Sequence, residues 1–371
     1  MKKIFAMLLA VIMVFSLATV AFATTYEGPN SPDQTTGTYV DIEKVQLKKT
    51  YKTVGENAKN PAEDFEYTIS LKSYSDSGYI KQSDIPLPYF DNAADQTGII
   101  SFTEGEATAT GDTNTVDINL PEYEYVGIYT YEIKETKGNT MGVTYDDNSL
   151  FLKVTAVEQD GIVRVAALHY EKEDGAKTEG FENIYSADDL TVEKIVTGNL
   201  GDQTKDFSFN VKFNVPTDGS VYVKNTIEVW VNGAKVQSFV SLVDGYNLNL
   251  TLRHGQNFEI KNLPYGVTYT VTEADYTDEG YDAPLYQYLV KMGGATIWMN
   301  EGSSLNDVTY DAAKIAELCV VDGENEYVKV TNNKEAEVDT GIALDSMPYV
   351  LILAVAAVGL VLFTTKKRVQ E

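Results

Sequence analysis

Two sets of polar residues lie in stretches that otherwise alternate apolar side chains along the chain. Each set contains a lysine, a glutamate and an asparagine, in that order. A β-strand directs alternate side chains to one face, so each polar group shares a face with apolar neighbours and is expected to be buried. The first set is Lys49, Glu135 and Asn183, and the second set is Lys194, Glu273 and Asn332.

Buried groups of these three types predict a covalent crosslink. Burial disfavours charge, which lowers the pKa of a lysine amine and raises the pKa of a glutamic acid. The neutral amine is a nucleophile, and the protonated acid can donate to the carbonyl oxygen of the asparagine side chain and polarise it. Attack on that carbon expels ammonia and leaves an uncharged amide between lysine and asparagine. We expect this reaction to be spontaneous and to occur once per site, with Glu135 and Glu273 assisting it.

Two simpler interpretations stay open at this point. The lysines and glutamates could form buried ion pairs beside a hydrogen-bonded asparagine, or they could lie in water at strand ends. The repetition of one residue order in both halves of the chain favours the crosslink. Lys44 and Lys48 are alternatives to Lys49, which is favoured by its spacing from Phe65.

The stretches that carry these residues alternate like β-strands, and the pattern of the first half repeats in the second. Few segments have a helical period, and no clear pattern assigns residues 73–115. Residues 186–189 are predicted to be a short polar joint between two strands. We therefore predict an all-β fold of two tandem immunoglobulin-like β-sandwich domains, residues 38–186 and 187–334. The predicted strands include residues 45–51, 65–71, 127–135, 150–157, 162–170, 181–185, 190–196, 207–213, 266–273 and 327–332.

The two ends of the chain predict export and membrane anchoring. Residues 1–23 combine two lysines, an apolar run and small residues, which is the order of a cleaved secretory signal peptide. Residues 24–37 are expected to be a flexible leader. Residues 347–363 are apolar and precede three basic residues, which predicts a transmembrane anchor with residues 364–371 in the cytoplasm. Residues 335–346 link the second domain to this anchor.

The composition argues against several classes of function. The formal net charge of −26 disfavours a nucleic-acid partner, which requires a basic face. The single cysteine, Cys319, can form no internal disulfide. The two histidines, His169 and His254, lack the spacing of metal ligands, and no phosphate-binding loop or Ser-His-Asp order is present. We therefore expect no metal, no cofactor and no nucleic acid.

Four motifs add to this pattern. They are residues 190–198 (LTVEKIVTG), 205–209 (KDFSF), 262–273 (NLPYGVTYTVTE) and 337–341 (EVDTG). They resemble motifs of the two-domain backbone (shaft) pilins of Gram-positive bacteria, the streptococcal type among them. The resemblance covers nearly the whole chain between the predicted signal and anchor. It implies a structural protein rather than an enzyme, in which both Lys–Glu–Asn sets form intramolecular isopeptide bonds.

The resemblance also implies assembly at the cell surface. In these pilins, a membrane sortase of the class C type cuts between Thr and Gly of a sorting motif and passes the Thr carbonyl to a lysine of the next copy. The accepting lysine lies in the loop before the first asparagine, where we expect Lys177, with Lys172 as the alternative. The sorting motif here is Glu337, Val338, Asp339, Thr340 and Gly341, cut between the last two residues.

One residue departs from the family pattern. The family has proline before the threonine, whereas this chain has Asp339. Proline fixes φ and presets the bend of the motif, which aspartate does not. Either the partner sortase differs, or the protein stays a membrane-anchored monomer. The tryptophan-bearing motif of another pilin group is absent.

These features predict a structural subunit of a covalent pilus on the cell surface or wall of a Gram-positive bacterium, made from a membrane-anchored precursor. Its partners would be the sortase, neighbouring copies of itself, and minor or tip pilins. The alternative is a cell-surface adhesin with the same stapled domains that does not polymerise. A secreted hydrolase with two carboxylates is a third class, but the acids follow a strand repeat and form no site-like cluster.

Overall fold

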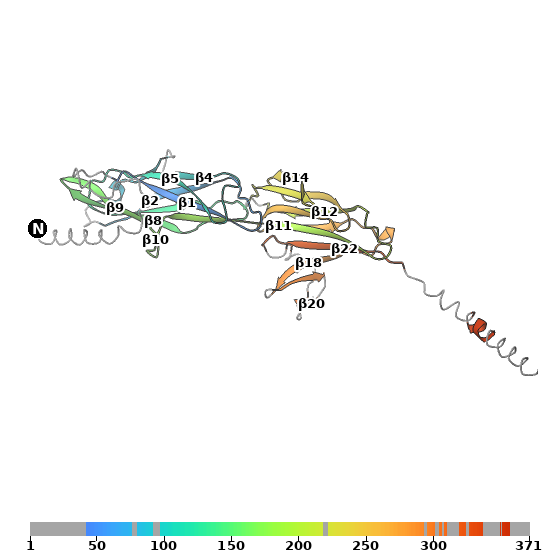
Figure 1. The fold of residues 1–371 in the computed structure, drawn as a ribbon. Coiled ribbons are helices and arrows are strands. Elements are labelled where there is room, and N and C mark those ends of the chain that lie inside the picture. Colours follow the sequence, from blue (N-terminus) through green and yellow to red (C-terminus); the bar gives the residue numbers. More distant parts are fainter. Residues whose placement is uncertain are drawn as a thin grey trace, which may run out of the picture.

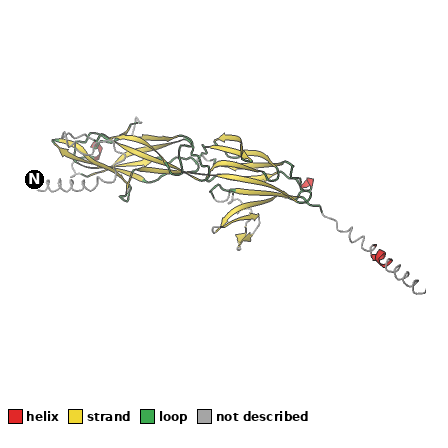
Figure 2. Cartoon of the chain, viewed as in Figure 1, coloured by secondary structure: helices red, strands yellow, loops and turns green. Residues whose placement is uncertain are grey.

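The computed structural model describes residues 42–75, 80–91, 97–217, 222–292, 295–300, 304–305, 308–309, 319–323, 326–336, 349 and 351–356. Strands make up two bodies that follow one another along a rod (Figure 1, Figure 2). Among the described residues of these bodies, the helical elements are two short 3-10 turns. The predicted signal peptide, leader and sorting motif lie outside the described residues, as does most of the predicted anchor. In the described part of the chain, no helix has the length and apolar character needed to cross a membrane.

The first body packs two sheets around one apolar core. Its elements are β1 (Lys44–Val54), β2 (Glu63–Tyr74), η1 (Gln82–Asp84), β3 (Tyr89–Phe90), β4 (Thr97–Phe102), β5 (Asp112–Asn119), β6 (Gly127–Glu135), β7 (Val143–Thr144), β8 (Ser149–Gln159), β9 (Ile162–Glu171), β10 (Lys177–Thr178) and β11 (Gly180–Thr197). One layer has the order β11-β1-β5-β3, and the other has the order β10-β9-β8-β6-β2-β4. Residues along β1 and β2 alternate between buried and more exposed, as expected for strands with one face on a core.

The second body repeats this construction around a separate core. Its elements are β12 (Phe207–Asn214), β13 (Thr226–Val231), β14 (Ala234–Val240), β15 (Asn247–Leu252), β16 (Asn257–Pro264), β17 (Thr268–Glu273), η2 (Thr277–Glu279), β18 (Leu285–Met292), β19 (Ala295–Asn300), β20 (Ser304–Leu305), β21 (Val308–Thr309) and β22 (Tyr327–Asn333). The larger layer contains β14-β13-β16-β11, extended by β22, β18 and β19. The facing layer has the order β15-β12-β17.

Strand β11 belongs to both bodies and runs from one to the other (Figure 1). Its first part pairs with β1 in parallel, and its last part pairs with β22 in parallel. The prediction of a polar joint at residues 186–189 was therefore wrong. Ala187 and Asp188 find ladder partners in β16, so the backbone stays extended, with one irregularity between Asp188 and Leu190.

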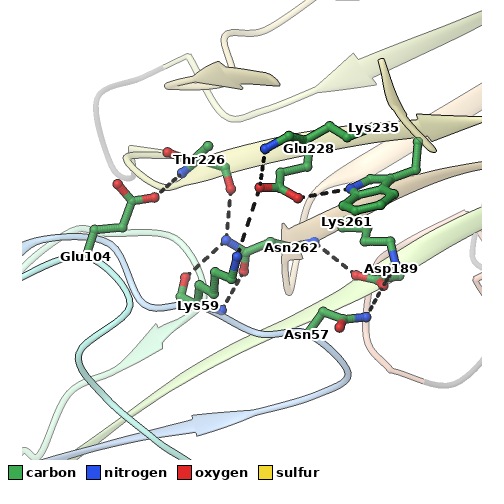
Figure 3. Close-up of polar contacts among 10 residues, drawn as sticks. Asn57, Lys59, Glu104, Asp189, Thr226, Glu228, Lys235, Lys261 and Asn262 are labelled. Carbon is green, nitrogen blue, oxygen red and sulfur yellow. Dashed lines mark hydrogen bonds and ion pairs between the residues drawn. The ribbon is translucent and has the colours of Figure 1, made fainter. Parts of the chain in front are cut away.

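Asn262, at the end of β16, ties the second body to a loop of the first (Figure 3). Its Oδ1 accepts the backbone N–H of Lys59 at 2.9 Å. Its Nδ2 donates to the backbone carbonyls of Lys59 at 3.1 Å and Thr226 at 2.9 Å. The side chain thus satisfies backbone groups of both bodies, which lose their water when the junction forms. Its φ of 65° lies in the left-handed region, where asparagine is better tolerated than most residues.

Apolar packing also crosses the junction. Met141, from the segment after β6, belongs to the core of the second body, and its N–H donates to the carbonyl of Tyr222 at 2.8 Å. On the first-body side of the junction, Gly55 lies against the backbone of Ala187 in β11, where an added Cβ would stand 1.6 Å from the carbonyl oxygen. The two bodies are therefore joined by packed contacts as well as by the chain.

Candidate functional site

The first lysine and asparagine lie on adjacent parallel strands. Lys49 of β1 is opposite Phe181 of β11, two residues before Asn183, so both polar side chains enter the same core. Glu135, at the end of β6 in the facing layer, reaches them from the other side. The side chains of Lys49 and Glu135 are both 0% exposed. The structure thus brings together all three residues of the first predicted set, and it does so with Lys49 rather than its neighbours.

Lys44 and Lys48 have partners elsewhere on β1. Lys44 pairs with Asp117 at 2.5 Å, and Lys48 pairs with Glu179 at 2.6 Å. Both of these ion pairs are open to solvent, unlike the pair of Lys49 and Glu135. Of the three nearby lysines, Lys49 alone reaches the buried glutamate in the described structure.

Glu135 contacts two nitrogens of the first site. Its Oε2 pairs with Nζ of Lys49, and its Oε1 accepts a hydrogen bond from Nδ2 of Asn183 at 2.5 Å. The backbone N–H of Asp146 donates to Oδ1 of Asn183 at 2.7 Å. Because a backbone N–H can only donate, this contact determines which way the amide points. The carboxyl group therefore lies between the amine and the amide nitrogen, whereas the sequence predicts a contact with the carbonyl oxygen.

Aromatic rings enclose the first site and shift its proton affinities. Nζ of Lys49 lies 4.7 Å from the centroid of the Phe65 ring and 5.8 Å from that of Phe181. The hydroxyl of Tyr67 donates to Oε2 of Glu135 at 3.5 Å. Burial lowers the pKa of Lys49 to about 8, and the attraction of Glu135 partly opposes this shift. Burial likewise raises the pKa of Glu135 above its ordinary value, against the attraction of Lys49.

The second site uses β11, β17 and β22 in the same way. Lys194 is opposite Val330, two residues before Asn332, and Glu273 comes from the facing layer. The side chains of Lys194 and Glu273 are both 0% exposed. Nζ of Lys194 lies 4.3 Å from the centroid of the Phe207 ring. Burial lowers the pKa of Lys194 and raises the pKa of Glu273, and the attraction between them opposes both shifts.

The polar contacts of the second site differ from those of the first. Nζ of Lys194 donates to Oδ1 of Asn332 and to the carbonyl of Val330, the latter at 3.5 Å. The amine also lies 3.0 Å from Oε1 of Glu273, which makes a buried ion pair. Within the described residues, both carboxylate oxygens and Nδ2 of Asn332 lack a hydrogen-bond partner. The lysine here meets the carbonyl oxygen of the amide.

A third lysine, glutamate and asparagine gather at the junction without forming such a site (Figure 3). Nζ of Lys59 lies 4.0 Å from Oε1 of Glu228, and the Lys59 side chain is 60% exposed. The side-chain oxygen and nitrogen of Asn262 are occupied by backbone groups. The amine keeps its water and the amide has other partners, so the residue types alone do not create the buried geometry.

The two candidate acceptor lysines lie on the segment between β9 and β11. Lys177 begins the two-residue strand β10, and Lys172 begins a turn closed by its N–H bond to the carbonyl of Ala176 at 2.8 Å. Both are exposed. An open cavity of about 370 Å³ lies beside this segment, and its lining includes Lys172, Lys48 and Phe181. Both lysines are therefore accessible from solvent.

Two domain-family profiles match the chain in succession. Residues 45–186 match the Spy0128-like isopeptide containing domain, and residues 188–334 match a domain of unknown function, DUF7601. A curated relative from Streptococcus pyogenes serotype M1 bears the name Pilin. It is 29% identical over 341 residues, which are 89% of this chain and 92% of the relative.

Solved structures of similar proteins include the major pilin from Streptococcus pyogenes. It is 25% identical, the match covers 80% of this chain and 100% of the other, and the TM-score is 0.48. The major pilin protein T3.2 from Streptococcus pyogenes serotype GAS13637 is 19% identical, with 79% and 98% of the two chains covered and a TM-score of 0.47. The sequence matches, which span both bodies, carry the relationship.

Proposed function

We propose that this chain, a homologue of the streptococcal pilins with a Spy0128-like isopeptide domain as its first body, is a structural subunit of a covalent surface pilus. The observation that carries the proposal is the repeated buried set of lysine, glutamate and asparagine, which lies between the first and last strands of each body. Each body would be an immunoglobulin-like domain stapled by one isopeptide bond. The bonds would join Lys49 to Asn183 and Lys194 to Asn332.

The contacts of the first site support the following proton movements for such a bond. Transfer of a proton within the buried pair leaves a neutral amine on Lys49 and a protonated Glu135. Nζ then attacks Cγ of Asn183, while Oε2 of the glutamic acid takes a proton from Nζ and Oε1 gives one to Nδ2. The bond from Cγ to Nδ2 breaks and ammonia leaves. One amine and one primary amide thus give one secondary amide and one ammonia, and the glutamic acid ends protonated as it began.

The proposal for assembly is a head-to-tail linkage. The signal peptide, residues 1–23, and the anchor, residues 347–363, would hold the precursor at the membrane for a sortase of the class C type. The enzyme would cut between Thr340 and Gly341 and pass the Thr340 carbonyl to Lys177 of the next copy. A head-to-tail contact that does not close into a ring makes a fibre. Neighbouring copies, minor pilins and tip pilins would be the partners of this fibre.

The first test is the intact mass of the native ectodomain, residues 24–337. We expect a deficit of two ammonias relative to the mass calculated from the sequence. Glu135→Ala should restore one ammonia, and Glu273→Ala should restore the other. An unmodified mass in the folded ectodomain would contradict the crosslinks and leave two ordinary domains with buried ion pairs.

Polymerisation needs a separate test in producing cells. We expect the surface extract to contain a ladder of high-mass species that survives boiling in detergent. The ladder should be lost in Lys177→Ala and kept in Lys172→Ala. The opposite result would assign the other lysine, whereas a single band from wild-type cells would favour a membrane-anchored adhesin.

A further inference from the structure

The first site contains a hydrogen-bond donor that belongs to the backbone rather than to a side chain. The backbone N–H of Asp146 donates to Oδ1 of Asn183 at 2.7 Å. Negative charge develops on this oxygen when Nζ of Lys49 attacks the adjacent carbon. Nδ2 of the same amide is held by Oε1 of Glu135 at 2.5 Å, so the amide cannot turn over without losing both bonds.

We propose that the backbone amide of Asp146 is the oxyanion donor of the first crosslinking reaction, and that the Asp146 carboxylate is a positioning group that holds this amide against Asn183. The inference rests on the crosslinking function proposed above. As the Nζ–Cγ bond forms, the π electron pair of the carbonyl moves onto Oδ1, where the N–H stabilises it. The pair returns when the C–O double bond re-forms and ammonia leaves. A donor that is already in place requires no rearrangement during this step.

The Asp146 side chain ties its own loop to the strand that carries the amide. Its Oδ1 accepts the backbone N–H of Asn148 at 3.0 Å and Nδ2 of Asn148 at 2.6 Å. Its Oδ2 accepts the backbone N–H of Glu182, the residue before Asn183, at 3.3 Å. One carboxylate thus bonds to the loop and to β11, which holds the donor and the acceptor at a defined separation.

The residue before Asp146 anchors the other side of the loop. The hydroxyl of Tyr145 donates to Oε1 of Glu63 at 2.9 Å, and its ring meets the Phe65 ring edge-on with 6.1 Å between centroids. Phe65 is also the ring that lies beside Nζ of Lys49. The loop that supplies the donor and the ring that shields the amine are therefore packed against each other.

The second site offers an internal reference. Within the described residues, the hydrogen bond to Oδ1 of Asn332 comes from Nζ of Lys194. A change confined to the loop around Asp146 should therefore leave the second reaction unaffected. The two reactions can be followed in one chain, because peptide mapping by mass assigns each lost ammonia to its own crosslink.

The test compares four variants of the ectodomain, recovered unlinked from inclusion bodies and diluted from denaturant into native buffer. Asp146→Pro removes the N–H, Asp146→Ala keeps the N–H but frees the loop, and Asp146→Asn keeps an acceptor in the side chain. Asp147→Pro is the control, since it places the same ring at the exposed neighbouring residue. The rate of the first crosslink is expressed relative to that of the second in the same molecules.

We expect Asp146→Pro to slow the first crosslink about 100-fold or more, as removal of an oxyanion donor does in enzymes. Asp146→Ala should slow it less than Asp146→Pro does. Asp146→Asn should lie between Asp146→Ala and the wild type, because its single acceptor oxygen can keep the bond to the loop or the bond to β11 but not both. Asp147→Pro should keep the wild-type rate. A wild-type rate in Asp146→Pro, with the first domain resistant to protease, overturns the donor role.

Further outcomes test the role of Asp146 separately from the crosslinking reaction on which it depends. If Asp146→Pro does not fold, equal rates in Asp146→Ala and Asp146→Asn overturn the positioning role, and a faster asparagine variant supports it. A folded wild-type chain that loses no ammonia contradicts the crosslinking function itself. Normal ammonia loss in the wild type and in every Asp146 variant contradicts only this inference.

Discussion

The two sites are built from the same parts but place their amides differently. Each has a lysine and an asparagine on adjacent parallel strands, a glutamate from the facing layer and a phenylalanine ring beside the amine. In the first site, Glu135 bonds to both nitrogens and a loop amide takes the carbonyl oxygen of Asn183. In the second, Nζ of Lys194 takes the carbonyl oxygen of Asn332. The strands thus specify which groups meet, whereas the surrounding loop specifies how the amide is oriented.

A second difference lies on the strand beside each glutamate. Tyr67 of β2 is opposite Glu135, and Phe209 of β12 is opposite Glu273. The Tyr67 hydroxyl reaches Oε2 of Glu135 at 3.5 Å, whereas a phenylalanine has no donor to offer. The two domains therefore differ by one hydroxyl at an equivalent position in the sheet, which makes them a natural pair for matched substitutions.

The largest expected effect is the loss of one crosslink. Asn183→Ala should lower the free energy of unfolding of the first domain by about 4.7 kcal/mol, the entropic value for closing a loop on the order of 100 residues. Asn332→Ala should do the same to the second domain. Each variant should leave the other domain unchanged, because the two proposed crosslinks would lie beside separate apolar cores. Native-state hydrogen exchange would report the two domains separately.

Asn333→Ala is the matched control for this prediction. Asn333 follows Asn332 on β22, but its side chain bonds to Thr197 and Asp282 at the surface. The loss of these two exposed hydrogen bonds should cost only about 1 to 2 kcal/mol. Equal losses in Asn332→Ala and Asn333→Ala would show that no covalent staple stabilises the second domain.

Both sets of site residues could be selected from the sequence because burial on a strand face is a local pattern. Lys49 and Asn183 each alternate with apolar neighbours on their own strands, and that alternation survives in the fold. Asp146 could not be selected in this way, since every residue except proline carries a backbone N–H. The local run Asp146-Asp-Asn-Ser149 is typical of a side-chain-capped turn and was the available signal for this loop.

Two features of the fold depend on partners that are distant in sequence. Strand β5 was not predicted from the sequence because Val116 and Ile118 are its only buried residues, so the alternation along it is weak. The continuity of β11 escaped assignment because polar residues at 186–189 are typical of a loop. Their extended conformation is stabilised by pairing with β16, which follows much later in the chain. The pattern of apolar residues within a short stretch of sequence does not reveal pairing with a strand that is distant in the chain.

The next effect is the dependence of the crosslinking rate on pH. In both sites the rate should fall as the pH rises above the pKa of the lysine. Reaction requires the pair of Lys49 and Glu135 to hold one shared proton, with the amine neutral and the acid protonated. Burial lowers the pKa of Lys49 to about 8, so above this pH the shared proton is lost and Glu135 remains a carboxylate. The rate of first ammonia loss should then fall about 10-fold per pH unit, because no acid protonates the leaving nitrogen.

Refolding of the unlinked chain at a series of pH values would measure this profile. A rate that instead rises up to the ordinary pKa of lysine would show that a free neutral amine is sufficient. The second site should also lose rate in alkali, because burial shifts the pKa values of Lys194 and Glu273 in the same directions. Opposite slopes in the two domains would break the equivalence of their chemistry.

A smaller effect is expected from the hydroxyl that distinguishes the two domains. Tyr67→Phe should slow the first crosslink by about 2-fold. A single long hydrogen bond contributes about 0.5 kcal/mol, the lower end of the range for hydrogen bonds in proteins, and this energy changes a rate by about that factor. Phe209→Tyr should speed the second crosslink by a similar factor. The ratio of the two rates within one chain would measure both changes. If neither variant changes the ratio of the two crosslinking rates, the hydroxyl has no effect, and any difference in rate between the sites would be due to the loop around Asp146.

The smallest expected effect is no change in mass at all, and it concerns the set at the junction. Lys59, Glu228 and Asn262 have the residue types of the two buried sites, but the Lys59 side chain is 60% exposed and the asparagine amide is occupied by backbone groups. Asn262→Gly suits the φ of 65° and removes only the side chain. The variant should therefore show the same ammonia deficit as the wild type. A third lost ammonia that disappears in Asn262→Gly would mean that proximity of these residue types suffices without burial, and the argument from desolvation would fail for all three sets.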